Sequence, residues 1–189
     1  GPNDNYDLVK SHVLPALVRK MHLGKCLLNN DWNAIRSDFN RLPVEGLRGN
    51  ANEREITAEL SRHGILREEG KVSVRLWGTG SPMREFLHSD DMADACVYIM
   101  ENIDFQDLVN LRKKTVGEEA AKEVRNTHIN IGTGKDLTIR ELAEVVKKIV
   151  GFKGELLWDA SKPDGTMRKL LNVDKLHELG WKETISLQE

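Results

Sequence analysis

The stretch Lys71-Val-Ser-Val-Arg-Leu-Trp77, followed by Gly78-Thr-Gly-Ser-Pro82, indicates how this chain folds. Val72, Val74 and Leu76 alternate with polar residues, which is the pattern of a strand with one buried face. The glycines and proline that follow are typical of a tight turn. We therefore predict a strand over 71–77 that ends in a sharp turn.

Further elements follow this turn. Glu85–His88 predicts a second short strand, and Ser89 is the expected N-cap of a helix over 90–103, which has acidic residues in its first turn. Residues 104–126 are charged and poorly patterned, so they predict a helix or a solvated connection. A capping box, Thr138-x-x-Glu141, opens a helix that Gly151 ends. The other expectations are strands at His128–Ile131 and Glu155–Trp158, a loop over 159–169 and a short helix near 173–179.

The sequence before residue 71 predicts helices. Apolar residues recur at helical spacing over 11–28, with Ser11 as the expected N-cap and Gly24 as a stop or kink. Two polar segments, 31–42 and 52–63, predict amphipathic helices, and Gly64 is well placed as a C-cap. Because strands alternate with helices, the fold class is α/β. The strands are short and few, which favours a subdomain over a self-sufficient enzyme core.

Composition narrows the possible partners and compartment. The 189 residues carry a formal charge of −2, which argues against nucleic acid or an anionic membrane as a partner. No apolar run approaches the length of a membrane span. Cys26 and Cys96 are too few for a disulfide scaffold, so we expect reduced thiols and a cytoplasmic location. The chain begins at Gly1 without a methionine, which suggests a piece of a longer protein.

Two Gly-x-Gly turns are the first candidates for nucleotide binding. A dinucleotide fingerprint needs a third glycine three residues after the second, but Met83 and Leu137 occupy those positions. We therefore interpret Gly78-x-Gly80 and Gly132-x-Gly134 as tight turns, with phosphate binding by the second turn as the minor alternative.

The polar motifs are less specific. Tyr6-x-x-x-Lys10 matches the proton-relay pattern of short-chain reductases, but no nucleotide-binding unit precedes it, so we interpret it as a chance match. The six histidines form no metal-ligand spacing, so no metal is expected. We interpret His88 as a structural residue. For Trp77 there are two alternatives, packing in the core or stacking on a base. The cations Arg84, Lys162, Arg168 and Lys169 lie in or beside loops, where they are available to phosphate.

The run Trp77-Gly-Thr-Gly-Ser-Pro-Met-Arg-Glu-Phe-Leu-His-Ser-Asp-Asp-Met-Ala-Asp-Ala95 resembles the GDP-L-fucose synthase family of the extended short-chain dehydrogenases/reductases. Ser11-His-Val-Leu-Pro-Ala-Leu17, His128-Ile-Asn-Ile-Gly-Thr-Gly134 and Ser161-Lys-Pro-Asp-Gly-Thr-Met-Arg-Lys169 agree with it. The last of these runs is the most specific. Together the matching stretches cover roughly half of the chain, in the family's order.

The resemblance implies the C-terminal, substrate-binding part of such an enzyme, with the N-terminal Rossmann domain absent. The complete enzyme would use NADPH to convert GDP-4-keto-6-deoxy-D-mannose to GDP-L-fucose, and would form a homodimer. The family's cofactor loop, catalytic Tyr-x-x-x-Lys and epimerase cysteine are not matched here. We therefore expect the chain alone to bind no cofactor and to be inactive.

Five site residues follow from the resemblance. His12 matches the family's acid in the epimerisations, which also contacts the cofactor. Arg84 and Lys169 match residues near the GDP pyrophosphate, and Trp77 matches a substrate-contacting tryptophan. Lys20 stands where some relatives have arginine, so it keeps the charge but loses the planar fork.

The main departure from the family is an insertion over residues 29–70 of what is otherwise one substrate-binding domain over 1–189. The two amphipathic helices of this insertion suggest a lid, an oligomer surface or peripheral padding. Two rival interpretations stay open. One is a fragment of another nucleotide-sugar enzyme, such as a GDP-mannose dehydratase or a UDP-hexose epimerase. The other is a stand-alone nucleotide-sugar binding or assembly module.

Overall fold

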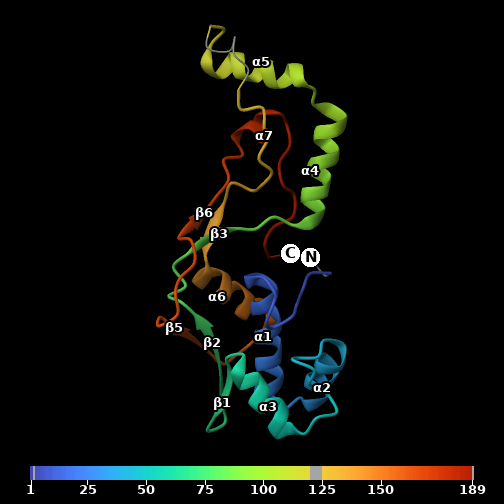
Figure 1. The fold of residues 1–189 in the computed structure, drawn as a ribbon, viewed down its shortest axis with the longest axis vertical. Coiled ribbons are helices and arrows are strands. Elements are labelled where there is room, and N and C mark those ends of the chain that lie inside the picture. Colours follow the sequence, from blue (N-terminus) through green and yellow to red (C-terminus); the bar gives the residue numbers. More distant parts are fainter. Residues whose placement is uncertain (2, 120–124, 189) are drawn as a thin grey trace. The chain divides into compact units, whose positions relative to one another are not determined.

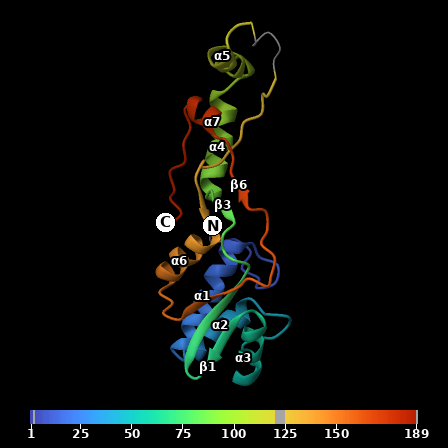
Figure 2. The same cartoon turned by 90° about the vertical axis from the view of Figure 1, so that its left-hand side faces the viewer.

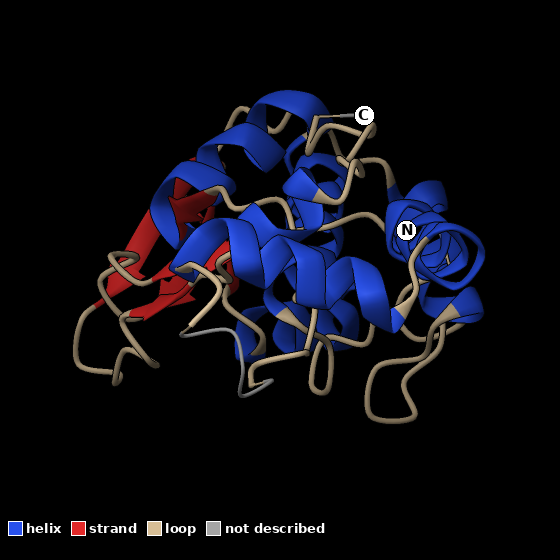
Figure 3. Ribbon diagram, turned by 90° about the horizontal axis from the view of Figure 1, so that it is seen from above, coloured by secondary structure: helices blue, strands red, loops and turns tan. Residues whose placement is uncertain are grey.

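A computed structural model describes residues 1, 3–119 and 125–188 of the chain. The chain divides into two compact units. Unit 1 comprises Gly1, Met83–Leu137 and Arg168–Glu189, and unit 2 comprises Pro2–Pro82 and Thr138–Met167. Helices, blue in Figure 3, are the more abundant regular structure of the described chain, and the strands, red, are short. The α/β class is confirmed.

A three-stranded sheet, in the order β1-β2-β5, organises unit 2 (Figure 1). β1 (Ile65–Glu68) pairs antiparallel with β2 (Lys71–Trp77), and β2 pairs parallel with β5 (Glu155–Asp159). The predicted strand over 71–77 is confirmed, with its alternate apolar residues buried. β1 was not predicted. It is four residues long and depends on the two-residue turn at Glu69 and Gly70, both with positive φ, which matches the twist of a hairpin.

Four helices pack around this sheet. They are α1 (Val13–Leu28), α2 (Trp32–Arg41), α3 (Glu53–Arg62) and α6 (Ile139–Val150). α1 contacts both β1 and β2 as well as α2 and α6, and α3 lies beside β1 (Figure 2). The predicted capping box at Thr138 is complete, and a second one, which was not predicted, forms at Asn52. Gly64 and Gly151 follow α3 and α6 with positive φ, as expected at helix ends.

Two details predicted for α1 are wrong. The helix begins after His12 rather than Ser11, and no side chain caps it. Gly24 neither stops nor kinks the helix, which continues to Leu28. A Cβ at Gly24 would lie 3.1 Å from the Phe152 ring and 3.3 Å from Val74, so the glycine lets α1 approach the sheet closely.

The segment predicted to be an insertion contributes directly to the core of unit 2. The side chains of Ile35, Phe39, Ile56 and Leu60 are fully buried. α2 is also tied to α1 by a buried ion pair, in which Arg19 Nη2 lies 2.7 Å from Asp38 Oδ1. The helices of this segment are therefore packed into the unit rather than peripheral to it.

Unit 1 contains α4 (Ser89–Asn102), α5 (Phe105–Val116) and α7 (Asp174–Glu178). Its sheet has the order β4-β3-β6, formed by β4 (Asp136–Thr138), β3 (Met83–Glu85) and β6 (Arg168–Lys169). The core is a small cluster of Ala95, Leu176 and Trp181, against which Tyr98 and Ile99 of α4 pack. The Trp181 indole also donates to Asp94 Oδ2 at 2.8 Å.

Several boundaries predicted in unit 1 are wrong. The strand expected at Glu85–His88 is Met83–Glu85, and the loop expected over 159–169 ends in β6. His88 rather than Ser89 caps α4, since its Nδ1 accepts from the Asp90 N–H at 3.2 Å, so His88 has the structural role expected of it. His128–Ile131 is not a strand, because no described strand pairs with it; Ile129 and Ile131 pack instead on the core cluster. Residues 120–124 of the predicted 104–126 connection lie outside the described residues.

Asp91 ties the C-terminal segment to α4. Its carboxylate is 2 % exposed and accepts from Thr184 Oγ1 at 2.9 Å and from the Ile185 N–H at 3.0 Å. Burial raises the pKa of Asp91, but the hydrogen bonds from Ile185 and Thr184 more than compensate, so the net pKa lies below the usual 3.8.

We therefore expect unit 1 to lose stability in acid. The folded pKa of Asp91 is depressed, so its contribution is present above the unfolded pKa and is lost as pH falls through the folded value. Thermal unfolding of the wild type and of Asp91→Asn at pH 7 and pH 3 measures this. The variant should start less stable at pH 7 and lose less on acidification. An equal acid shift in both proteins would contradict the assignment.

Candidate functional site

Arg84 and Lys169, the two residues expected near a pyrophosphate, lie side by side in unit 1. They are Cα partners across the parallel β3–β6 pair. Partners on adjacent strands project from the same face of a sheet, and neighbouring strands lie about 4.8 Å apart. Arg84 is half-buried and Lys169 is exposed, and Arg84 Nη1 donates to the Met83 carbonyl at 2.7 Å. The arrangement places a planar guanidinium beside an ammonium, which suits a polyanion such as a diphosphate.

Glu85 anchors the strand that carries Arg84. Glu85 Oε1 accepts from the Thr133 and Gly134 N–H groups, both at 2.6 Å, and Glu85 Oε2 accepts from the Leu171 N–H at 3.1 Å. A Cβ at Gly132 would lie 2.5 Å from this carboxylate, so a larger residue there would displace Glu85 from the N–H groups that it accepts from. The protein's own carboxylate therefore occupies the N–H groups of the second Gly-x-Gly turn. The tight-turn interpretation is confirmed.

An ion pair holds β6 in place. Arg168 Nε lies 2.6 Å from Asp136 Oδ2, which joins β6 to β4. The hydrogen bond from the Arg168 guanidinium holds the pKa of Asp136 below its usual value. The Asp136 carboxylate thus neutralises the positive charge of Arg168. Lys169, the next residue of β6, is exposed.

An open groove of about 650 Å³ adjoins these elements within unit 1. This is the size of a small-molecule site. Its lining combines the Gly-x-Gly turn with the chain after β6, and comprises Thr133, Gly134, Lys135, Arg168, Leu170, Leu171, Asn172, Val173, Asp174 and His177. Of the predicted cations, Arg168 lines the groove.

Trp77 is the last residue of β2 in unit 2 and is 75 % exposed. The alternative that it packs in the core is therefore wrong. The Lys162 ammonium lies 5.7 Å from the centroid of its ring. A large exposed aromatic face beside a cation is suited to stacking on a base or a sugar.

His12 and Lys20 both belong to the α1 region of unit 2. His12 is exposed at the N-cap, and Lys20 is half-buried eight residues later, which is about 12 Å along the helix axis. Burial lowers the pKa of the Lys20 ammonium. Among the described residues no hydrogen bond or ion pair satisfies this ammonium. The structure does not bring His12 and Lys20 into contact with each other.

The Tyr6-x-x-x-Lys10 pattern is not a proton relay in this structure. Both residues lie in the loop before α1, and Lys10 is exposed. A relay of this spacing needs a helix to place the two side chains on one face. The geometry supports the interpretation of a chance match.

The residues that sequence reasoning missed are the carboxylates that hold the turns. Glu85 contacts residues 48 and more positions away, and Asp164 binds Thr79, which is 85 positions away. Glu85 follows Arg84 in the run that carried the resemblance, which was the available signal for it. Nothing local to Asp164 indicates its partner.

Comparison with known proteins shows what the chain is similar to. The model of the NAD dependent epimerase/dehydratase family matches residues 43–111. Over all 189 residues the chain is 39% identical to GDP-L-fucose synthase 1 of Arabidopsis thaliana, and over 188 residues 39% identical to GDP-L-fucose synthase of Escherichia coli. The chain is similar to these GDP-L-fucose synthases over its full length. It spans about two fifths of their length, 39% and 42% in these two cases.

Solved structures of GDP-sugar reductases share the fold. A GDP-6-OMe-4-keto-L-xylo-heptose reductase from C. jejuni matches 98% of this chain with a TM-score of 0.78 and 45% identity, over 47% of its own chain. MlghC, a GDP-mannoheptose C4 reductase from Campylobacter jejuni with NADP bound, matches 98% with a TM-score of 0.75 and 42% identity, over 46% of its own chain. As in the GDP-L-fucose synthases, the similarity covers the whole chain and part of the relative. Among the described residues no helix is long and apolar enough to cross a membrane.

Proposed function

We propose that the chain is the substrate-binding part of an NADPH-dependent epimerase/reductase that converts GDP-4-keto-6-deoxy-D-mannose to GDP-L-fucose. The observation that carries this proposal is the pairing of Arg84 with Lys169 across β3 and β6. Two adjacent cations of different geometry suit the pyrophosphate of a nucleotide sugar. The identity to GDP-L-fucose synthases supports guanosine as the nucleoside.

The proposal also assigns chemistry to three residues of unit 2. His12 acts as the acid that returns a proton to the substrate during epimerisation and also contacts the cofactor. Inversion of a carbon requires removal and return of the proton on opposite faces, so His12 needs a base across the substrate from it. Trp77 contacts the substrate through its exposed ring. Lys20, half-buried and with a lowered pKa, gains a counterion when an anionic substrate binds.

The cofactor of the complete enzyme is NADPH in this proposal, and it would supply the hydride for reduction of the C4 ketone. The two Gly-x-Gly turns do not fit its phosphates. The Thr133 and Gly134 N–H groups donate to Glu85, and the Thr79 N–H donates to Asp164 at 2.9 Å. The 189 residues are therefore proposed to bind GDP-sugar without binding cofactor and without turnover. A cytoplasmic location, a homodimeric complete enzyme and an inserted segment over 29–70 belong to the same proposal.

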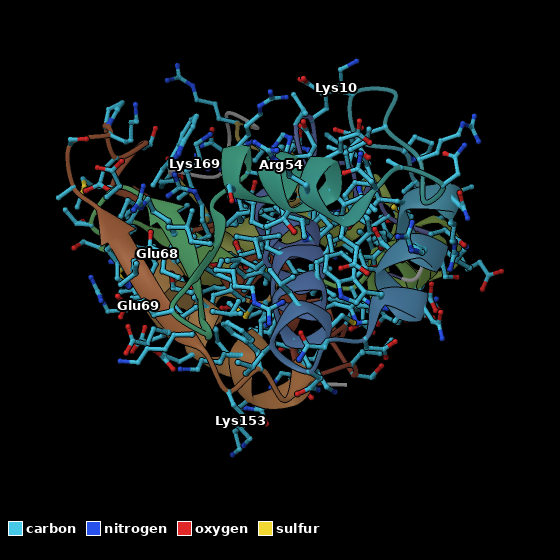
Figure 4. The ribbon with its side chains drawn as sticks, turned by 90° about the horizontal axis from the view of Figure 1, so that it is seen from below. Lys10, Arg54, Glu68, Glu69, Lys153 and Lys169 are labelled. Carbon is cyan, nitrogen blue, oxygen red and sulfur yellow. The ribbon has the colours of Figure 1, made fainter. Side chains whose placement is uncertain are left out.

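Titration of GDP and UDP by calorimetry tests the proposal. We expect GDP to bind more tightly than UDP, and Arg84→Ala to weaken GDP binding by about tenfold, since a charge-assisted contact is lost. Arg54→Ala is the matched control, because Arg54 is an exposed arginine on α3 of unit 2 (Figure 4). Equal heats for wild type and Arg84→Ala would remove Arg84 from the site. A preference for UDP would favour a UDP-hexose enzyme instead.

A second candidate is a GDP-heptose reductase. It is favoured by the 42% and 45% identities to the two C. jejuni reductases, which exceed the 39% to the GDP-L-fucose synthases. The complete enzyme, supplied with NADPH and either GDP-4-keto-6-deoxy-D-mannose or a GDP-4-keto-heptose, distinguishes the two. Faster NADPH oxidation with the heptose would establish the second candidate. Tight GDP binding with neither substrate reduced would favour a binding module.

A further inference from the structure

The loop after β5 is folded over the end of β2. β2 and β5 run parallel, and Trp77 and Asp159 are partners at their last positions. The Gly78 and Lys162 N–H groups both donate to the Asp159 carbonyl, at 3.0 and 3.1 Å. Ligands of open α/β sheets bind beyond the carboxyl ends of parallel strands, which is where this loop lies.

Asp164 holds this loop against the turn that follows Trp77. Its Oδ1 accepts from the Thr79 N–H at 2.9 Å, and its Oδ2 accepts from Thr79 Oγ1 at 2.7 Å. A Cβ at Gly78 would lie 2.2 Å from Asp164 Oδ1, so the approach requires glycine. The loop and the strand end therefore form one fixed structure.

This structure places a cation over an exposed aromatic ring. Lys162 Nζ lies 5.7 Å from the Trp77 centroid, within the range of a cation–π contact. Within the described part of the chain, no hydrogen bond or ion pair uses this ammonium. Asp164, two residues further on, directs its carboxylate to Thr79 instead. Asp159 accepts from Ser161 Oγ, and the charge of Lys162 helps to lower the Asp159 pKa without a direct ion pair between the two side chains.

We propose that Lys162 is a further nucleotide-binding residue, which with Trp77 forms a clamp for a nucleoside diphosphate. The base stacks on the exposed Trp77 ring, and the Lys162 ammonium pairs with a phosphate of the same ligand. Asp164 is the positioning residue that keeps the two together through Thr79. The inference rests on the proposed function and extends it to a cation that the family resemblance did not assign.

Calorimetric titration of the 189-residue chain with GDP and with guanosine tests the clamp. Lys162→Met keeps the length and apolar contact of the side chain and removes its charge. We expect it to weaken GDP binding about tenfold, to leave guanosine binding unchanged and to reduce the salt dependence of GDP affinity. Lys162→Arg should restore most of the GDP affinity. Trp77→Leu should weaken both ligands, because stacking does not depend on the phosphates.

Lys153→Met is the control, since Lys153 points outward just before β5 (Figure 4). Thermal unfolding of each variant confirms that it folds. If GDP binds the wild type and Lys162→Met equally, the clamp is overturned while the proposed function stands. An equal loss of GDP and guanosine affinity in Lys162→Met would show a steric rather than a phosphate-directed role and would also overturn it. No GDP binding by the wild type would overturn both.

Discussion

Arg19→Met is expected to lower the free energy of unfolding by about 3–5 kcal/mol, because it leaves the partly buried Asp38 carboxylate and two backbone carbonyls without their donor. Arg19 is 3 % exposed. Its Nε and Nη2 both donate to Asp38 Oδ1, and Nη1 donates to the Tyr6 carbonyl at 3.1 Å. Nη2 also donates to the Leu42 carbonyl. One guanidinium thus holds α1, α2 and the N-terminal loop of unit 2 together. Urea unfolding followed by circular dichroism measures the change.

The double variant Arg19→Met/Asp38→Leu separates the loss of the ion pair itself from the cost of leaving the Asp38 carboxylate unpaired. Removing both charges should recover a large part of the loss, since apolar pairs of similar volume often replace buried ion pairs at little cost. Arg54→Ala, an exposed arginine in the same unit, should change stability by less than about 0.5 kcal/mol. A loss below about 1 kcal/mol in Arg19→Met would contradict a structural role for this ion pair.

Glu85→Ala is the second variant with a large expected effect. It removes the acceptor of three backbone N–H groups, those of Thr133, Gly134 and Leu171. The Thr133 and Gly134 N–H groups are partly buried, whereas the exposed Leu171 N–H can turn to water. A buried donor left without a partner costs about 1–3 kcal/mol, so we expect a total loss of at least about 2 kcal/mol. Because Glu85 neighbours Arg84 on β3, the proposed role of Arg84 predicts that GDP affinity falls together with stability.

Glu85→Gln provides a matched control for this prediction. The amide oxygen can still accept from Thr133 and Gly134, but the amide nitrogen then faces the Leu171 N–H, donor against donor. The expected loss is about 1–2 kcal/mol, between wild type and Glu85→Ala. Unfolding by urea ranks the three proteins. If Glu85→Ala unfolds like the wild type, the carboxylate does not hold the Gly-x-Gly turn.

Most secondary structure could be predicted because its signals are local. The capping box at Thr138 needs only a residue three positions on, and it formed as expected; the one at Asn52 carries the same local signal but was not predicted. The strand over 71–77 was visible in its alternation of apolar residues. The predicted strand over 128–131 failed because its apolar residues are buried by side-chain packing rather than by a neighbouring strand.

The candidate site was only partly predictable. Arg84, Lys169 and Trp77 were named from a resemblance, and the structure adds that the first two are strand partners and that the third is exposed. Their role in binding stays a prediction. Gly24 shows the limit of local reasoning, since a glycine in a helix reads as a break. Here it is a point of close contact with Phe152.

The sequence by itself determined the α/β class, the helices with their caps and the relationship to the GDP-L-fucose synthases, because these depend on spacings of a few residues or on contiguous motifs. Only the tertiary structure decided which carboxylates fill the Gly-x-Gly turns, which charge is buried with Arg19 and which cation lies over Trp77. Those partners are 19 to 85 positions apart in the chain. A contact over such a distance depends on how the strands pair and the helices pack, and no local pattern of residues encodes it.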